Sequence, residues 1–221
     1  MHSRNVVGVG RRRVRAGARL VALVVALLVH AAGAAQSDVL INEILADPSL
    51  DWDGSGAYSS RDDEWVEIVN TGPNPVDLAG YRLAGADTSW RYEFAGVLAP
   101  GAVRVVYGSA SYAWEQDTGN PAYGLRLANT GGAISLWRLG VADTLMIDCY
   151  GYVDHEADDD RSSGRLPDGG AQWELFDALN PYTGDTAPLA SGCSPTPGAT
   201  ISCPTPVRPV TWGRVKRTIE E

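Results

Sequence analysis

Short segments that are apolar or alternate between apolar and polar residues recur along the chain, each bounded by glycine, proline, asparagine or aspartate. None keeps a helical period for long. The candidate strands cover residues 39–46, 64–70, 81–84, 91–94, 102–107, 133–137, 144–153 and 172–176. Many short strands at this spacing are typical of an antiparallel β-sandwich or barrel. The sequence therefore predicts an all-β body.

The segment 144–153 shows the clearest alternation. Successive side chains of a strand point to opposite faces, so we expect one face to carry Leu145, Ile147, Cys149 and Val153 toward the core. Cys149 is accordingly expected to be a buried thiol.

The first 35 residues differ from the rest of the chain in composition. They hold six of the 18 basic residues, no acidic residue, an apolar run at 20–29 and a small-residue end, which is the layout of a secretory signal peptide. Without these six positive charges the net charge changes from −9 to −15. We therefore expect a secreted or extracellular protein, with the cell surface as a further possibility.

The net negative charge limits the classes of partner that the protein is expected to bind. Affinity for nucleic acid depends mainly on Lys and Arg that neutralise phosphates, so nucleic acid is excluded as a main partner. No second apolar stretch approaches the roughly 18 to 20 residues of a membrane-spanning helix. No membrane span is expected in the mature chain.

The segment 51–62 has the ligand spacing of a calcium loop, with oxygen ligands at alternate places, a glycine for the sharp turn and a carboxylate at the end. The predicted ligands are the side chains of Asp51, Asp53, Ser55, Ser59 and Asp62 and the backbone carbonyl of Ala57. Closure by Asp makes the loop similar to those of dockerin modules. A calcium ion here would have a structural role. The alternative is an acidic turn without metal, because Asp and Gly are ordinary turn formers.

From residue 177 onward the periodicity fades and prolines become frequent, which predicts an extended C-terminal tail. Cys193 and Cys203 lie ten positions apart in this tail, and an exported protein permits a disulfide between them. The alternative pairing joins Cys149 to Cys193. Residues 211–221 form either a short helix that needs a partner surface or a frayed end.

Two further groups of residues are candidates for function. The acidic run 154–160 contains His155 and is interpreted as a solvated loop, with a metal site or a general base as the alternative. Aromatic residues in predicted loops could form a contact surface for carbohydrate or protein. They are Trp52, Tyr58, Trp90, Tyr112 and Trp114.

Six segments occur together in an order and spacing that match a known pattern. They are LINEILADP at 40–48, EWVEIVN at 64–70, VDLAGYRL at 76–83, LAPG at 98–101, LANTGG at 127–132 and GRLPDG at 164–169. Together they resemble the lamin tail domain in its secreted bacterial form. The resemblance implies an immunoglobulin-like antiparallel β-sandwich over residues 38–200. It leaves 1–35 as the signal peptide and 201–221 as an extended C-terminal tail.

The resemblance implies a module that binds or scaffolds. We therefore expect a secreted, non-catalytic binding or scaffolding module, stabilised by calcium, whose partner is a protein or glycan at the cell surface. The alternative is a small secreted hydrolase or nuclease that uses acidic residues, although the sequence has no G-x-S-x-G elbow and no histidine placed to pair with Cys149. A third hypothesis assigns the TWGRVKR stretch at 211–217 to a sorting or anchoring machine.

Overall fold

The computed structural model describes residues 38–141, 143–201 and 203. The expected signal peptide at 1–35 and the expected helix at 211–221 lie outside the described residues. Only residues 201 and 203 of the expected tail at 201–221 lie inside them.

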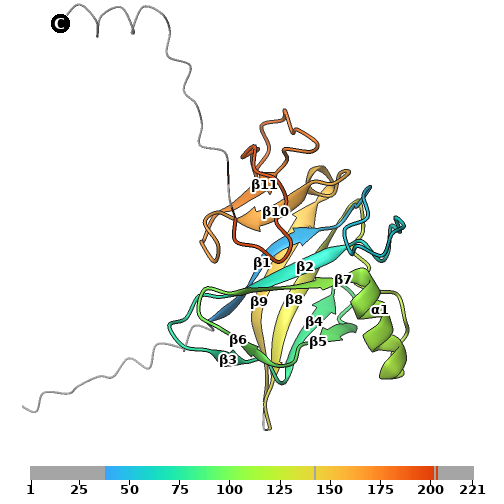
Figure 1. Ribbon diagram of the computed structural model, residues 1–221, viewed down its shortest axis with the longest axis vertical. Helices are drawn as coiled ribbons and strands as arrows, with labels where there is room; N and C mark the ends of the chain where they lie inside the picture. Colours follow the sequence, from blue (N-terminus) through green and yellow to red (C-terminus); the bar gives the residue numbers. More distant parts are fainter. Residues whose placement is uncertain (1–37, 142, 202, 204–221) are drawn as a thin grey trace, which may run out of the picture. The chain divides into compact units, whose positions relative to one another are not determined.

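Two antiparallel sheets pack on one apolar core (Figure 1). The first sheet has the strand order β11-β10-β1-β2-β7, the second has the order β5-β4-β8-β9, and β3 and β6 form a small pair. The strands are β1 (Val39–Leu45), β2 (Trp65–Asn70), β3 (Val76–Asp77), β4 (Tyr81–Gly85), β5 (Trp90–Glu93), β6 (Val97–Leu98), β7 (Val103–Tyr107), β8 (Gly131–Leu139), β9 (Thr144–Val153), β10 (Ser162–Arg165) and β11 (Trp173–Phe176). The arrangement confirms the predicted all-β, immunoglobulin-like sandwich.

All eight predicted strands exist, with ends that differ from the prediction by at most two residues. Strands β3, β6 and β10 were not predicted from the sequence. The first two have two residues each, and β10 is a short Ser-Ser-Gly-Arg segment without the apolar alternation of a typical strand. It pairs with β1 on one side and β11 on the other, so backbone hydrogen bonds rather than side-chain pattern define it.

A β-bulge at Asn42 decides which side chains of β1 enter the core. Ile41 is opposite Ile68 and Glu43 is opposite Glu67, so Asn42 is an extra residue in the ladder. The bulge shifts the inward-facing positions by one, and Ile44 therefore joins Ile41 in the core. Asn42 and Glu43 are both left on the outer face of the sheet.

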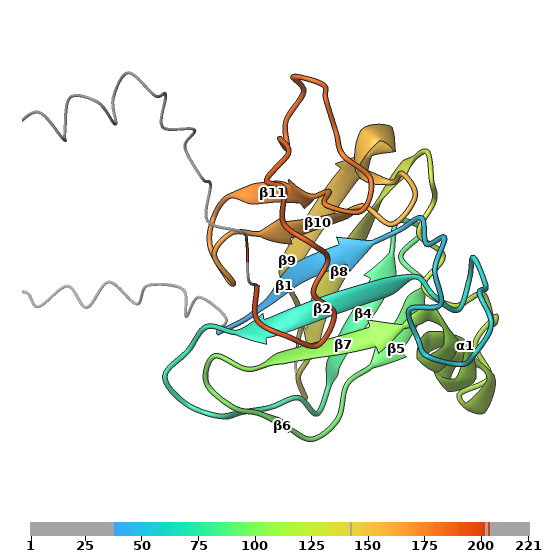
Figure 2. The same cartoon turned by 45° about the horizontal axis from the view of Figure 1, so that its top comes forward.

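The outer face of the first sheet is also covered. Glu43, Leu45, Trp65 and Glu67 lie on this face, and each has no exposed surface. The loop between β1 and β2 and the C-terminal segment after β11 supply the cover, and Figure 2 shows the C-terminal segment crossing β1 and β2. Strand β2 is consequently buried along its whole length.

Strand β9 contradicts the predicted assignment of its faces. Leu136 is opposite Asp148 and Trp137 is opposite Met146, so Ile147 is an extra residue, and the alternation changes phase there. After the bulge Tyr152 faces inward and is buried, whereas Cys149 is exposed. The expectation that Cys149 is a core thiol is therefore wrong.

Two helices among the described residues were not predicted: the α-helix α1 (Gly108–Asp117) and the 3₁₀ helix η1 (Asp154–Glu156). Helix α1 is the longer of the two. Its sequence, GSASYAWEQD, lacks an apolar stripe. Tertiary contacts fix it instead: Ser111 donates a hydrogen bond of 2.6 Å to the carbonyl of Arg91, and the Arg91 guanidinium lies 3.0 Å from the Glu115 carboxylate. Tyr112 and Trp114, expected in a loop, therefore belong to a helix.

Two leucine substitutions test the position of the core. Leu83 is fully buried in the core cluster, whereas Leu145 is 51% exposed on β9. Leu83→Ala should lower the free energy of unfolding by about 2–5 kcal/mol, because it leaves a cavity. Leu145→Ala should change it by about 0.5 kcal/mol or less. Urea unfolding of both variants checks this, and similar losses for the two would contradict the assigned core.

Candidate metal centre

The loop between β1 and β2 is organised around Asp63, which is fully buried at its end. One carboxylate oxygen of Asp63 accepts hydrogen bonds from the backbone N–H groups of Trp52 and Asp53, at 2.7 and 2.9 Å. The other oxygen accepts from the N–H of Ser59 at 2.7 Å. The carboxylate therefore joins both halves of the loop to the start of β2.

Asp51 and Asp53 lie beside Asp63 at the turn of the loop. Asp51 accepts from the N–H groups of Ser55 and Gly56 at 3.0 and 2.8 Å, and Asp53 accepts from Ser55 at 2.9 Å. The turn needs positive φ, which Gly56 supplies with a value of 92°. One carboxylate oxygen from each of the three aspartates lies within 4.8 Å of the others.

The remaining predicted ligands have other partners. The Ser55 hydroxyl donates to the carbonyl of Ala57 at 3.1 Å. The Ser59 hydroxyl donates to Asp62 at 3.0 Å, and Arg61 holds the Asp62 carboxylate through two hydrogen bonds of 2.7 and 2.9 Å. The structure thus brings Asp51 and Asp53 together with Asp63, while Asp62 is paired with its neighbour.

The electrostatics distinguish these carboxylates. The hydrogen bonds and charge of Arg61 lower the pKa of Asp62 against a smaller opposing effect of burial. Burial acts to raise the pKa of Asp53, but hydrogen bonds from Ser109 and Ser55 outweigh it and lower that pKa. Both groups are therefore held in the charged form, which is also the form that binds a cation.

The three-aspartate group has the chemistry of a calcium site. Calcium binds oxygen ligands at about 2.3–2.6 Å, so two oxygens on one ion can be up to about 5 Å apart. One carboxylate oxygen from each of Asp51, Asp53 and Asp63 lies within 4.8 Å of the other two, which agrees with this geometry. Backbone N–H donors already occupy part of each carboxylate, so the loop also has a stable arrangement that uses hydrogen bonds alone.

Asp63 was not among the predicted ligands, because the calcium-loop spacing puts the closing carboxylate at the twelfth position, which is Asp62. Here β2 begins at Trp65, and the strand geometry turns Asp63 rather than Asp62 toward the loop. The adjacent pair Asp62-Asp63 could have indicated this ligand. Successive side chains of an extended segment point to opposite faces, so one of the two is turned inward before the buried strand.

Several residues of the acidic run at 154–160 contact neighbouring parts of the fold. Asp160 is 6% exposed and accepts from Trp52 Nε1 at 2.7 Å, so it supports the β1–β2 loop. Glu156 accepts from the hydroxyl groups of Tyr150 and Ser163. The ring of His155 stacks on Tyr182 with centroids 4.8 Å apart. Asp154, Asp158 and Asp159 are exposed, so the run is solvated in part.

The described part of the chain contains a disulfide between Cys193 and Cys203, with Cα atoms 4.6 Å apart, and Cys149 is free. This is the first of the two pairings considered from the sequence.

Among the residues that the structure describes, no helix is both long enough and apolar enough to cross a membrane.

The hydrogen bonds of Asp63 give a test that does not require a metal. Asp63→Asn removes one oxygen acceptor and points an amide N–H₂ at buried N–H donors, which should lower the free energy of unfolding by about 1–3 kcal/mol. Asp62→Asn removes a half-exposed ion pair and should cost about 1 kcal/mol or less. Urea unfolding in the presence of a chelator measures both. Equal losses would contradict the central role of Asp63.

Comparison with known proteins gives one match. The family model described as Lamin Tail Domain matches residues 32–154, more than half of the chain. No curated protein and no solved structure matches the chain. The match ends before β10 and β11, although both strands continue the sheet that β1 and β2 begin.

Proposed function

The chain belongs to the lamin tail domain family, and we propose that it is a secreted binding or scaffolding module without catalytic activity. The observation that carries the proposal is the family match on an immunoglobulin-like sandwich. Export is supported by the signal-like composition of residues 1–35 and by a disulfide, which persists mainly in oxidising compartments.

The proposed contact surface is the outer face of the second sheet, around two tryptophans. The rings of Trp90 and Trp137 meet edge to face with centroids 6.2 Å apart. They line a shallow cleft of about 180 Å³ together with Ala84, Thr88 and Thr144. Large aromatic rings that are only partly buried are typical of binding surfaces, because they offer apolar area at little cost in conformational entropy. The partner is a protein or a glycan at the cell surface.

Calcium at Asp51, Asp53 and Asp63 is the second part of the proposal. The ion would neutralise three neighbouring carboxylates and fix the loop that covers Trp65 on the outer face of the first sheet. Its role is structural, since the loop's partners are the sandwich's own residues: Trp52 packs against Trp65 with ring centroids 6.1 Å apart.

Binding is tested by capture of surface proteins and by a glycan array, both with the full secreted chain. Trp137→Ala should weaken binding of the captured partner about tenfold or more, as expected for an aromatic anchor. Trp114→Ala, on α1, is the matched control and should bind normally. Both variants must first show unchanged urea unfolding cooperativity.

If the Trp137→Ala variant bound the captured partner as tightly as the unchanged protein, the proposed contact surface would be wrong. Turnover of an esterase, protease, glycosidase or nuclease substrate by the purified chain would contradict the non-catalytic module.

Calcium binding is tested by thermal unfolding at increasing calcium concentration. A ligand at a hundred times its dissociation constant should stabilise the fold by about 2.7 kcal/mol. The double variant Asp51→Asn/Asp53→Asn should abolish this stabilisation, whereas Asp117→Asn on the exposed end of α1 should keep it. The absence of any shift in millimolar calcium would refute the site.

A further inference from the structure

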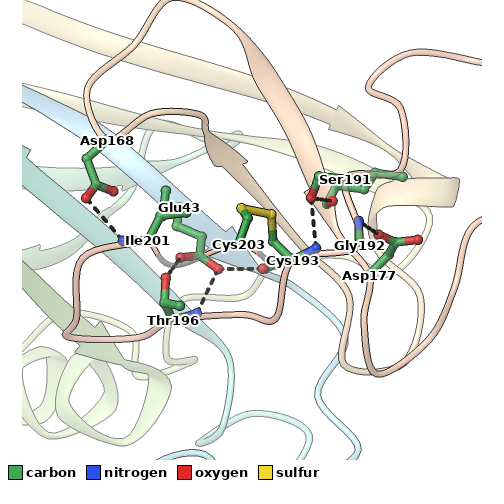
Figure 3. The surroundings of a disulfide bond; sticks show 11 residues. Glu43, Asp168, Asp177, Ser191, Gly192, Cys193, Thr196, Ile201 and Cys203 are labelled. Carbon is green, nitrogen blue, oxygen red and sulfur yellow. Dashed lines mark hydrogen bonds between the residues drawn. A yellow bond between two sulfur atoms is a disulfide. The ribbon is translucent and has the colours of Figure 1, made fainter. Parts of the chain in front are cut away.

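Residues 194–201, which we call the strap, lie across the outer face of the first sheet. Thr196 lies over β1, where it binds Glu43, and Gly198 lies over β2, where it binds Glu67; a Cβ at Gly198 would lie 3.6 Å from Val105 of β7. Figure 3 shows the strap passing over Glu43 and returning beside Asp168 to the disulfide.

Carboxylates hold the strap on the sheet. Glu43 accepts hydrogen bonds from the hydroxyl and the N–H of Thr196, at 2.9 and 3.2 Å. Glu67 accepts from the N–H of Gly198 at 2.7 Å, and Asp168 accepts from the N–H of Ile201 at 3.2 Å. These three acidic groups come from β1, β2 and the β10–β11 turn, and they form a row under the strap.

The two ends of the strap are attached differently. At the Cys193 end, backbone groups of the segment make two hydrogen bonds. The Cys193 carbonyl accepts from the N–H of Ala178 at 2.9 Å, and the N–H of Gly192 donates to the Asp177 carboxylate at 2.8 Å. At the other end the described attachments are the disulfide and the single hydrogen bond of Ile201. Breaking the disulfide therefore frees one end only.

We infer that the strap is a removable cover locked by the Cys193–Cys203 disulfide, and that reduction of this bond opens the acidic outer face of β1 and β2. The closed state leaves Glu43 and Glu67 with no exposed surface. The open state returns both carboxylates to water and presents them beside Asp168.

The chemical step needs a dithiol reductant, either a small molecule or a thioredoxin-like protein. Cys203 is half-buried and Cys193 is fully buried, so a thiolate of the reductant attacks the Cys203 sulfur and releases the Cys193 thiolate. The second thiol of the reductant then displaces Cys203 and closes the reductant's own disulfide. Two electrons pass to the cystine, and two protons end on the two cysteines.

The buried carboxylates make opening depend on pH. Burial raises the pKa of Glu43 to about 8 and that of Glu67 to about 7. Glu67 faces Glu43, and the carboxylate of Asp168 and the phenol of Tyr107 face Glu67; none of these neighbours supplies a positive charge. The closed state thus binds protons more tightly than the open state. Its stability is complete in acid, below the ordinary carboxyl pKa near 4.5, and is lost as pH rises through 7 and 8.

Amide hydrogen exchange on the full chain tests the lock. In the oxidised protein we expect the strap amides to be protected. Reduction by dithiothreitol, or the double variant Cys193→Ser/Cys203→Ser, should lower their protection factors about a hundredfold at pH 8.5, the effect of losing a loop closure of this size. The amides of β1 and β2 should keep their protection. Cys149→Ser is the matched control and should behave as the oxidised protein.

Two results would overturn the inference: unchanged protection of the strap after reduction, or an equal loss of protection in β1 and β2, which would make the strap part of the cooperative core. The pH arm uses the disulfide-free protein, in which strap protection should fall between pH 5.5 and 8.5. Adding Glu43→Gln and Glu67→Gln should remove that fall, whereas adding Asp117→Asn should not. Persistence of the fall in the glutamine variant would refute the role of the carboxylates.

Discussion

The bulge at Asn42 is the constraint on which the first sheet depends. Strand β1 lies between β2 and β10, so its backbone is paired on both edges, and its two faces must satisfy different surroundings. The extra residue lets Ile41 and Ile44 both enter the core while Asn42 and Glu43 stay on the outer face. A strand of strict alternation would bury one of these polar side chains in the core instead.

Placing Glu43 and Glu67 under cover has a cost that the fold offsets with hydrogen-bond donors. A buried carboxylate is tolerated only where donors replace its water. Glu43 accepts from the Ser162 hydroxyl at 2.5 Å as well as from Thr196, and Glu67 accepts from the Asn42 amide at 2.9 Å. The donors come from β10, the bulge and the strap, so distant segments of the chain converge on one row of acids.

The sequence predicted eight of the eleven described strands, but not the phase of two of them. Short apolar segments such as 64–70, bounded by Asp63 and by the turn residues Thr71, Gly72 and Pro73, were enough to identify strands and their antiparallel class. Bulges at Asn42 and Ile147 leave no local signal, because each is defined by the partner strand, and the face of Cys149 was therefore wrong. The helix α1 was missed because its position depends on a tertiary contact, the ion pair between Glu115 and Arg91 of β5. In the β1–β2 loop the spacing indicated Asp51 and Asp53, but only the start of β2 shows that Asp63 lies beside them.

The outer face of β1 and β2 is covered, and its acidic side chains Glu43 and Glu67 have no surface exposed to water. The most direct measurement is an NMR titration of the side-chain carboxyl carbons of Glu43 and Glu67 in the oxidised protein. The account predicts midpoints near 8 and 7, because burial raises both pKa values. Midpoints near the ordinary 4.5 for both groups would show that water reaches them, and would contradict a covered face.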